Sequence, residues 1–147
     1  MTSLRKIMTR PILLLLALFA LACSAEDRPI KVLLVDGPQK FHKYQKTTPV
    51  LMAALEQSGR FEVDLSRSSP QACRDGSYRP EFADYDVVVV NEGYGAHAWP
   101  EATRAAFEKY IAGGGGMVSY HAANNAWPKW TAYNKMTGIG GWAGRNE

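Results

Sequence analysis

Three short runs of apolar residues constrain what this chain can fold into, because each run is nearly free of polar side chains. They are IKVLLVDG at residues 30–37, the valines 87–90 within FADYDVVVVNEG, and MVSYHAA at residues 117–123. Such runs suit strands that are buried on both faces, as in a parallel sheet covered by helices. We expect them to form the centre of one sheet, with the alternating segment FEVDLS at residues 61–66 as a more exposed strand.

Two segments with helical periodicity separate these strands. The first is TTPVLMAALEQSG, in which Thr47 or Thr48 is the expected N-cap and Gly59 the expected C-cap. The second is PEATRAAFEKYIAG, at residues 100–113. Helices that alternate with buried strands predict an α/β domain with a three-layer, open and mostly parallel sheet.

Polar side chains follow the predicted strands at the point where each strand ends. Asp36 closes the first run, Asn91 and Glu92 follow the valines, and His121 lies at the end of the third run. Ligands of open parallel sheets bind outside the carboxyl ends of the strands. The sequence therefore predicts a binding site at this edge of the sheet.

The four glycines at residues 113–116 stand between the second helix and the third buried strand. A helix C-cap and a tight turn both favour glycine there, at the edge opposite the expected site. Phosphate-binding loops instead follow a strand and precede a helix, and neither GxGxxG nor GxxxxGK occurs in the chain. We interpret the run as structural.

The N-terminus has the features of an export signal. Basic residues in MTSLRKIMTR precede an apolar run, PILLLLALFALA, which is shorter than the roughly 20 residues that a membrane-spanning helix needs. We expect residues 1–23 to form this signal and residues 24–29 a short linker. Ala20-Leu21-Ala22 before Cys23 resembles a lipoprotein cleavage site, but the same residues fit ordinary signal peptidase, so an acylated Cys23 and a soluble periplasmic or secreted protein remain alternatives.

Charge and cysteine content exclude several classes of protein. Seventeen basic residues oppose 14 acidic ones, and Arg5, Lys6 and Arg10 belong to the leader, which has no acid, so the remaining chain is formally neutral. We therefore expect no nucleic-acid partner, and a membrane contact only through a lipid anchor at Cys23. Cys73 would then be the single thiol, and we interpret it as a structural loop cysteine.

The chain has three histidines, and each follows one of the buried strands. His42, His97 and His121 are thus all expected at the carboxyl edge of the sheet. His121 could be a packed imidazole, a general acid or base, or a metal ligand. With Glu92 or Asp36 as a further base or oxygen ligand, the three imidazoles would suit zinc or another divalent metal. No cofactor is specified further.

Aromatic and amide side chains also gather after the strand ends. Indole rings beside amides suit the apolar face and hydroxyl groups of a sugar. The alternative is that the rings fill the core, since Trp127 and Trp130 are spaced to share one helix face. The candidate sugar contacts are Asn91, Trp99, Asn124, Trp127 and Trp130.

Together these segments resemble the ThuA-like, or trehalose-utilisation, family. The resemblance runs from about residue 30 to the end of the chain, and its most specific part is the glycine run, the strand and HAA, followed by WTAY. It implies a flavodoxin-like fold, similar to class I glutamine amidotransferases. His121 stands where an amidotransferase would carry its nucleophilic cysteine, so we expect no amidotransferase activity.

The resemblance also implies a role in carbohydrate utilisation, on a disaccharide or a 3-keto sugar. We expect an exported hydrolase, lyase or isomerase, metal-assisted if the histidines bind a metal, with His121, His42 and Glu92 as catalytic residues. The alternative is a non-catalytic sugar-binding lipoprotein that uses the same edge. The family's domain is longer than residues 30–147, so we expect this domain to be incomplete at its C-terminus.

Overall fold

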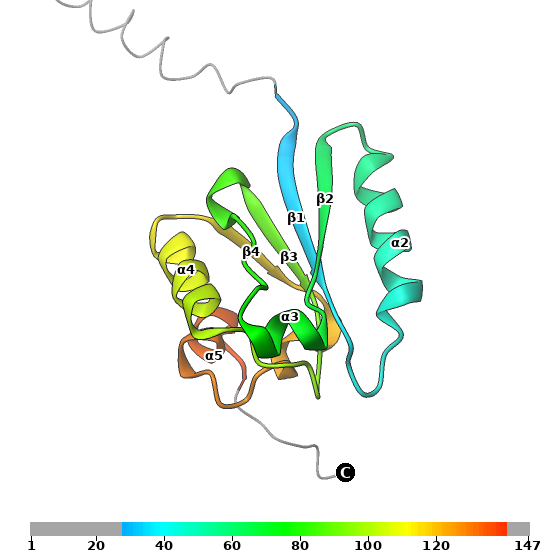
Figure 1. Ribbon diagram of the computed structural model, residues 1–147. Coiled ribbons are helices and arrows are strands. Elements are labelled where there is room, and N and C mark those ends of the chain that lie inside the picture. Colours follow the sequence, from blue (N-terminus) through cyan, green and yellow to red (C-terminus); the bar gives the residue numbers. More distant parts are fainter. Residues whose placement is uncertain (1–27, 141–147) are drawn as a thin grey trace, which may run out of the picture.

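One sheet lies between two layers of helices in residues 28–140, the part of the chain that the computed structural model describes (Figure 1). The first half of the elements, in chain order, is β1 (Ile30–Asp36), α2 (Tyr44–Glu56), β2 (Phe61–Arg67), α3 (Pro70–Asp75) and the 3₁₀ turn η1 (Phe82–Asp84). The second half is β3 (Val87–Asn91), α4 (Glu101–Ala112), β4 (Gly116–Ser119), the 3₁₀ turn η2 (His121–Asn125) and α5 (Thr131–Thr137).

The four described strands form a parallel sheet in the order β2-β1-β3-β4. This order confirms the predicted α/β class with an open sheet. Asp36 is in register with Arg67 on one side and with Asn91 on the other, so three strands end level. The chain passes from β1 to β2 on one side and later to β3 on the other. The strand order thus reverses between β1 and β3, where open α/β sheets bind their ligands.

Two apolar clusters cover the two faces of the sheet. On one face Val32 and Leu34 pack with Leu51 and Leu55 of α2. On the other face lie α3, α4 and α5, on the far side of the sheet from α2 (Figure 1). The cluster there is larger and rich in aromatic residues; its buried aromatic members are Tyr78, Phe82, Trp99, Phe107, Trp127, Trp130 and Tyr133. Strands β1 and β3 are therefore buried on both sides, as their apolar runs predicted. The third run forms β4 at the edge of the described sheet, where Val118 is 47% exposed, so the expectation of a central strand buried on both faces was wrong there.

Helix α2 begins at Tyr44, one turn before the predicted start. The expected cap residue Thr48 lies inside the helix, where its buried hydroxyl donates to Oδ2 of Asp36 at 2.8 Å. Pro49 also lies inside the helix. The Thr-Thr-Pro pattern predicted the helix but misplaced its first residue, because a contact with the sheet uses the hydroxyl that a cap would need.

The segment around Cys73, which was expected to be a loop, forms the short helix α3. Oγ of Ser69 accepts a hydrogen bond from the N–H of Ala72 at 3.1 Å, and Gly76 ends the helix with a φ of 78°. This is the usual pairing of a serine N-cap with a glycine C-cap. Cys73 is buried, and burial raises the pKa of its thiol to about 11, which agrees with a structural cysteine.

The glycine run forms the turn from α4 into β4. Gly114 has a φ of 95°, and a Cβ on Gly115 would collide with the ring of Tyr110. The Tyr110 hydroxyl donates to the carbonyl of Gly116 at 3.0 Å, which fixes the ring over the turn. The structural interpretation of these glycines is therefore confirmed.

Some predictions fall on residues outside the described range. The export signal at residues 1–23, the lipidation site Cys23 and most of the linker at 24–29 precede Arg28, and residues 141–147 also lie outside. None of the helices within residues 28–140 is long and apolar enough to cross a membrane. The export signal and the acylation of Cys23 stay predictions.

Candidate functional site

Asp36 at the end of β1 is a buried carboxylate whose two oxygens are both occupied. Arg67 donates to it through Nε at 2.8 Å and Nη2 at 2.9 Å, and Thr48 donates its hydroxyl. The hydrogen bonds to Asp36 raise the pKa of Arg67 above its ordinary value. Asp36 therefore ties β1, β2 and α2 together. It is not free to serve as the base or oxygen ligand that the sequence suggested.

Asn91 at the end of β3 is likewise engaged within the fold. Its side-chain Nδ2 donates to the hydroxyls of Thr47 at 2.9 Å and Thr48 at 3.0 Å. Its backbone carbonyl accepts a hydrogen bond from Nε2 of Gln39 at 3.2 Å. The side chain is buried. The structure thus uses this amide to join β3 to α2, although the sequence suggested a ligand contact.

Glu92 is a fully buried carboxyl with one oxygen satisfied and one alone. Oε1 accepts hydrogen bonds from Oγ of Ser68 at 2.7 Å and Nε1 of Trp99 at 3.1 Å. Oε2 is buried and has no partner among the described residues. Burial outweighs the two hydrogen bonds and raises the pKa of Glu92 to about 8. At neutral pH this group is mostly protonated and shielded from solvent, which corrects its assignment as an open catalytic base.

The contact between Ser68 and Glu92 depends on Gly37. A Cβ at this position would overlap Oγ of Ser68 and lie 3.4 Å from Cδ of Glu92. The residue after the first strand must therefore be glycine for the serine to reach the carboxyl. The Asp-Gly pair that marked the end of β1 in the sequence has this packing role.

His121 occupies a strained turn directly after β4. The strand ends at Ser119, two residues before the histidine, and η2 begins at His121. His121 has a φ of 48°, and it is the one non-glycine residue of the described range with a positive φ. A side chain in this region costs about 1–3 kcal/mol, and such residues persist mainly at functional sites. The turn presents an exposed imidazole at the carboxyl edge.

The structure brings His42 and His121 together from segments that follow two different strands, β1 and β4. Their ring centroids are 4.6 Å apart, and the ring planes meet at 72°, so one ring presents its edge to the other. His42 also lines a hollow of about 330 Å³ that residues 38–45 surround. This volume lies at the lower end of the range for small-molecule sites. His42 lines the hollow and His121 contacts His42, and two imidazoles in contact are suited to moving protons.

His97 is not part of this pair. Its backbone carbonyl accepts a hydrogen bond from Nε1 of Trp127 at 2.9 Å, and no contact joins its ring to the other histidines. In residues 28–140 no three His, Cys, Asp or Glu side chains group as a metal site requires. Catalytic zinc usually has three protein ligands, so His42 and His121 alone do not fit that pattern.

The tryptophans proposed as sugar contacts pack against one another in the core. Trp99, Trp127 and Trp130 are 2%, 6% and 5% exposed. The centroids of Trp99 and Trp127 are 4.6 Å apart, and Trp127 meets Tyr133 edge to face at 4.8 Å. Their ring faces are therefore occupied, as the core-filling alternative predicted. Asn124 lies in η2 near His121 and is half-buried.

Sequence reasoning missed three residues that line this edge. Phe41 is exposed beside His42, its ring stacks on Tyr94 with centroids 5.8 Å apart, and the Lys40 ammonium lies 5.2 Å from the Phe41 centroid. The available signal in the sequence was an aromatic residue next to a histidine, in the segment that follows the first buried strand. Loops at this edge carry binding residues in open sheets.

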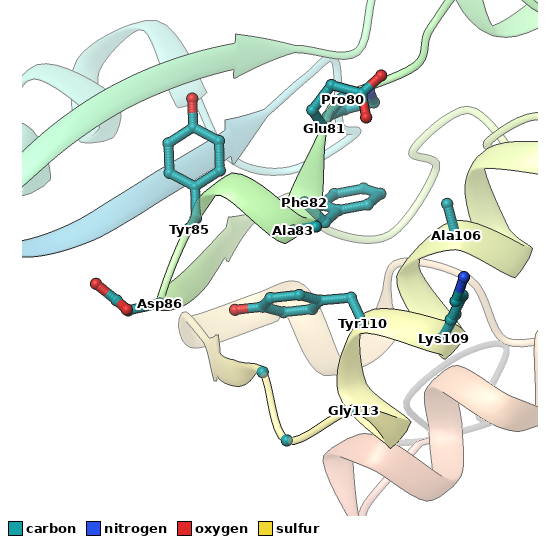
Figure 2. A pocket seen from close by; sticks show the side chains of 12 residues that line it. Pro80, Glu81, Phe82, Ala83, Tyr85, Asp86, Ala106, Lys109, Tyr110 and Gly113 are labelled. Atoms are coloured by element: carbon teal, nitrogen blue, oxygen red, sulfur yellow. The ribbon is translucent and has the colours of Figure 1, made fainter.

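A larger hollow, of about 610 Å³, lies at the opposite edge of the sheet. Figure 2 shows Tyr85, Phe82 and Tyr110 around it, with the glycine run below. Asp86 there forms an ion pair with Arg28 at 2.7 Å. This hollow holds neither a strained residue nor a histidine, so we place the candidate site at the carboxyl edge despite its smaller volume.

Comparison with known proteins agrees with this fold. The family model for ThuA, described as trehalose utilisation, matches residues 31–146. The chain belongs to the ThuA family. A crystal structure of a ThuA-like protein from Parabacteroides merdae matches with a TM-score of 0.71 and 41% identity, over 81% of this chain and 42% of that one. The ThuA chain described here thus spans less than half of that relative's length. A search of curated proteins finds no match.

Proposed function

We propose that His42 and His121 form an acid–base pair that acts on a carbohydrate, within the trehalose-utilisation role of the ThuA family. The observation that carries this proposal is His121 itself. Its backbone is held at a φ of 48°, and its ring lies 4.6 Å from that of His42. A fold that keeps a side chain in a costly conformation at a ligand-binding edge supports a functional role for it.

Because the carboxyl groups of Asp36 and Glu92 are occupied or buried, the site favours proton transfer at a carbon next to a carbonyl over hydrolysis of a glycosidic bond. Most glycosidases use two carboxyl groups on either side of the scissile bond. Here Arg67 and Thr48 occupy Asp36, and Glu92 is buried with a raised pKa. The pair of imidazoles remains. Of the hydrolase, lyase and isomerase alternatives, we therefore favour a lyase or isomerase acting on a keto sugar.

The chemistry requires one imidazole in each protonation state. Neutral His121 removes the proton from the carbon next to the sugar carbonyl, and protonated His42 donates its proton to the carbonyl oxygen, which gives an enediol. In an isomerase, His121 delivers its proton to the former carbonyl carbon, while His42 takes the hydroxyl proton from the neighbouring carbon's oxygen, so that the carbonyl moves by one carbon. In a lyase, the group on the carbon beyond the deprotonated one leaves with the proton from His121, while His42 takes back its proton from the enediol oxygen and the carbonyl reforms. Both routes balance without an additional reactant.

Amidotransferase chemistry has no nucleophile at this site. The turn after β4 carries His121, and Cys73 is buried with a raised thiol pKa. We therefore expect no glutamine hydrolysis. The second candidate function is a sugar-binding lipoprotein without turnover, which the exposed aromatic residue beside the hollow favours. In either case we propose export through residues 1–23, with a lipid anchor if Cys23 is acylated.

Exchange of a sugar C–H proton with solvent tests the acid–base proposal. The full chain is incubated in D₂O with trehalose and with its 3-keto derivative, and NMR follows deuterium incorporation next to the carbonyl. We expect wild type to accelerate exchange in the keto sugar. His121→Gln should lower this rate by at least about 100-fold, because general acid–base groups contribute about 10²–10⁴.

His97→Gln is the matched control, since it removes an imidazole from the same edge but outside the pair. It should exchange at the wild-type rate. Equal rates in wild type and His121→Gln would contradict the proposal. Binding of either sugar without exchange would favour the non-catalytic alternative.

A further inference from the structure

Phe41 is an aromatic side chain without the burial that the other large rings of the domain have. It is 67% exposed, and no other aromatic residue is among the strongly exposed large hydrophobic residues of the described range. Its place in the sequence, next to His42, puts it in the lining of the 330 Å³ hollow. An apolar ring that the fold leaves open beside a polar hollow is a candidate ligand contact.

The Phe41 ring is supported by a second loop. Tyr94, in the loop after β3, stacks on it with an interplanar angle of 20°. The N–H of Lys40 donates to the carbonyl of Tyr94 at 2.8 Å, which ties the two loops together. Gly95 has a φ of 84°, and its position leaves only 3.3 Å between a Cβ there and Cβ of Lys40. The two rings are thus held by backbone contacts.

The ammonium group of Lys40 places hydrogen-bond donors beside the two rings. Its Nζ lies 5.2 Å from the Phe41 centroid and 5.8 Å from the Tyr94 centroid. No carboxylate of residues 28–140 forms an ion pair with it. An ammonium above a pair of rings offers three N–H donors at the boundary between an apolar and a polar surface. A sugar presents the same two kinds of surface, C–H groups and hydroxyls.

From this geometry we infer that Phe41, Tyr94 and Lys40 form a subsite for a sugar ring. The sugar ring stacks on the aromatic ring of Phe41, and the sugar hydroxyls accept hydrogen bonds from the Lys40 ammonium. Because Phe41 and His42 are consecutive and line one hollow, a ring at this subsite lies beside the His42–His121 pair. This inference rests on the proposed carbohydrate function and assigns the binding role that the buried tryptophans do not fill.

Binding of trehalose to the full chain tests the subsite separately from the chemistry. NMR titration gives the Kd for wild type, Phe41→Ala, Phe41→Trp and Lys40→Met. Phe41→Ala should weaken binding about tenfold or more, since a ring face is lost, whereas Phe41→Trp should retain it. Lys40→Met should weaken binding by about threefold to tenfold. Sorbitol, which has no ring, should bind more weakly than trehalose in wild type.

Val50→Ala is the matched control, because Val50 on α2 is 68% exposed and lies outside the hollow. It should bind like wild type. Wild-type affinity in Phe41→Ala, or no measurable binding to wild type, would overturn the subsite. If His121→Gln still abolished exchange in that case, the acid–base function would stand. Conversely, weakened binding in Phe41→Ala without exchange in any protein would keep the subsite and reject the acid–base pair.

Discussion

His121→Gly should lose at least about 99% of turnover while its fold stays as stable as wild type. The imidazole that moves the proton is removed, so the rate falls. The backbone cost of the positive φ is removed as well, because glycine adopts this region freely. Glycine also has more conformational freedom in the unfolded chain, which offsets part of this gain. The free energy of unfolding should therefore stay constant or rise by up to about 1 kcal/mol.

His121→Ala is the control for this result, since alanine also lacks the imidazole but keeps the Cβ that makes a positive φ costly. Both variants should be equally inactive in the deuterium-exchange assay. In urea unfolding, the glycine variant should be the more stable of the two. A glycine variant that is less stable than the alanine variant would show that the turn at His121 carries no strain.

Glu92→Gln should remove a decline in stability that wild type shows as the pH rises. The unfolded chain ionises this carboxyl near its ordinary pKa of 4.5, whereas the folded protein holds the proton until about pH 8. Between these values unfolding releases a proton, so wild-type stability falls by about 1.4 kcal/mol for each pH unit. Below this window both states are protonated, and above it both are ionised, so the dependence ends on each side.

Glutamine preserves the neutral form of the side chain. Its Oε1 can still accept from Ser68 and Trp99, and it has no proton to release. At pH 8 the variant should therefore exceed wild type in unfolding free energy by on the order of 4 kcal/mol, with little difference at pH 4.5. Urea unfolding at several pH values measures this difference. Glu62→Gln, on the exposed face of β2, should keep the wild-type slope. If the free energy of unfolding of Glu92→Gln fell with pH as steeply as that of wild type, Glu92 would be ionised in the folded protein.

The strands were predictable because they depend on local patterns. Apolar runs predicted β1 and β3, and the polar residues after them mark the point where these two strands end. Binding at this edge stays a prediction. Short helix α3 could also have been found, since Ser69-Pro70 and Gly76 are ordinary cap signals.

The state of each site residue was not predictable, because it depends on segments far apart in the sequence. Glu92 is protonated owing to burial among elements that include Ser68, 24 residues away. Three histidines were expected at one edge, but the directions of their loops decide that only His42 and His121 meet. The sequence allowed the tryptophans to lie either in the core or at the surface, and the packing of the helices on the sheet decides that they lie in the core.

The most direct test of the paired histidines is a double-mutant cycle on the exchange rate of the keto sugar. The rates of wild type, His42→Gln, His121→Gln and the double variant are measured at one pH. Groups that act as a unit give non-additive losses, so the double variant should be no more than about threefold slower than the slower single variant. Losses that multiply, or a His42→Gln rate equal to that of wild type, would show that the two imidazoles act independently and would contradict the account.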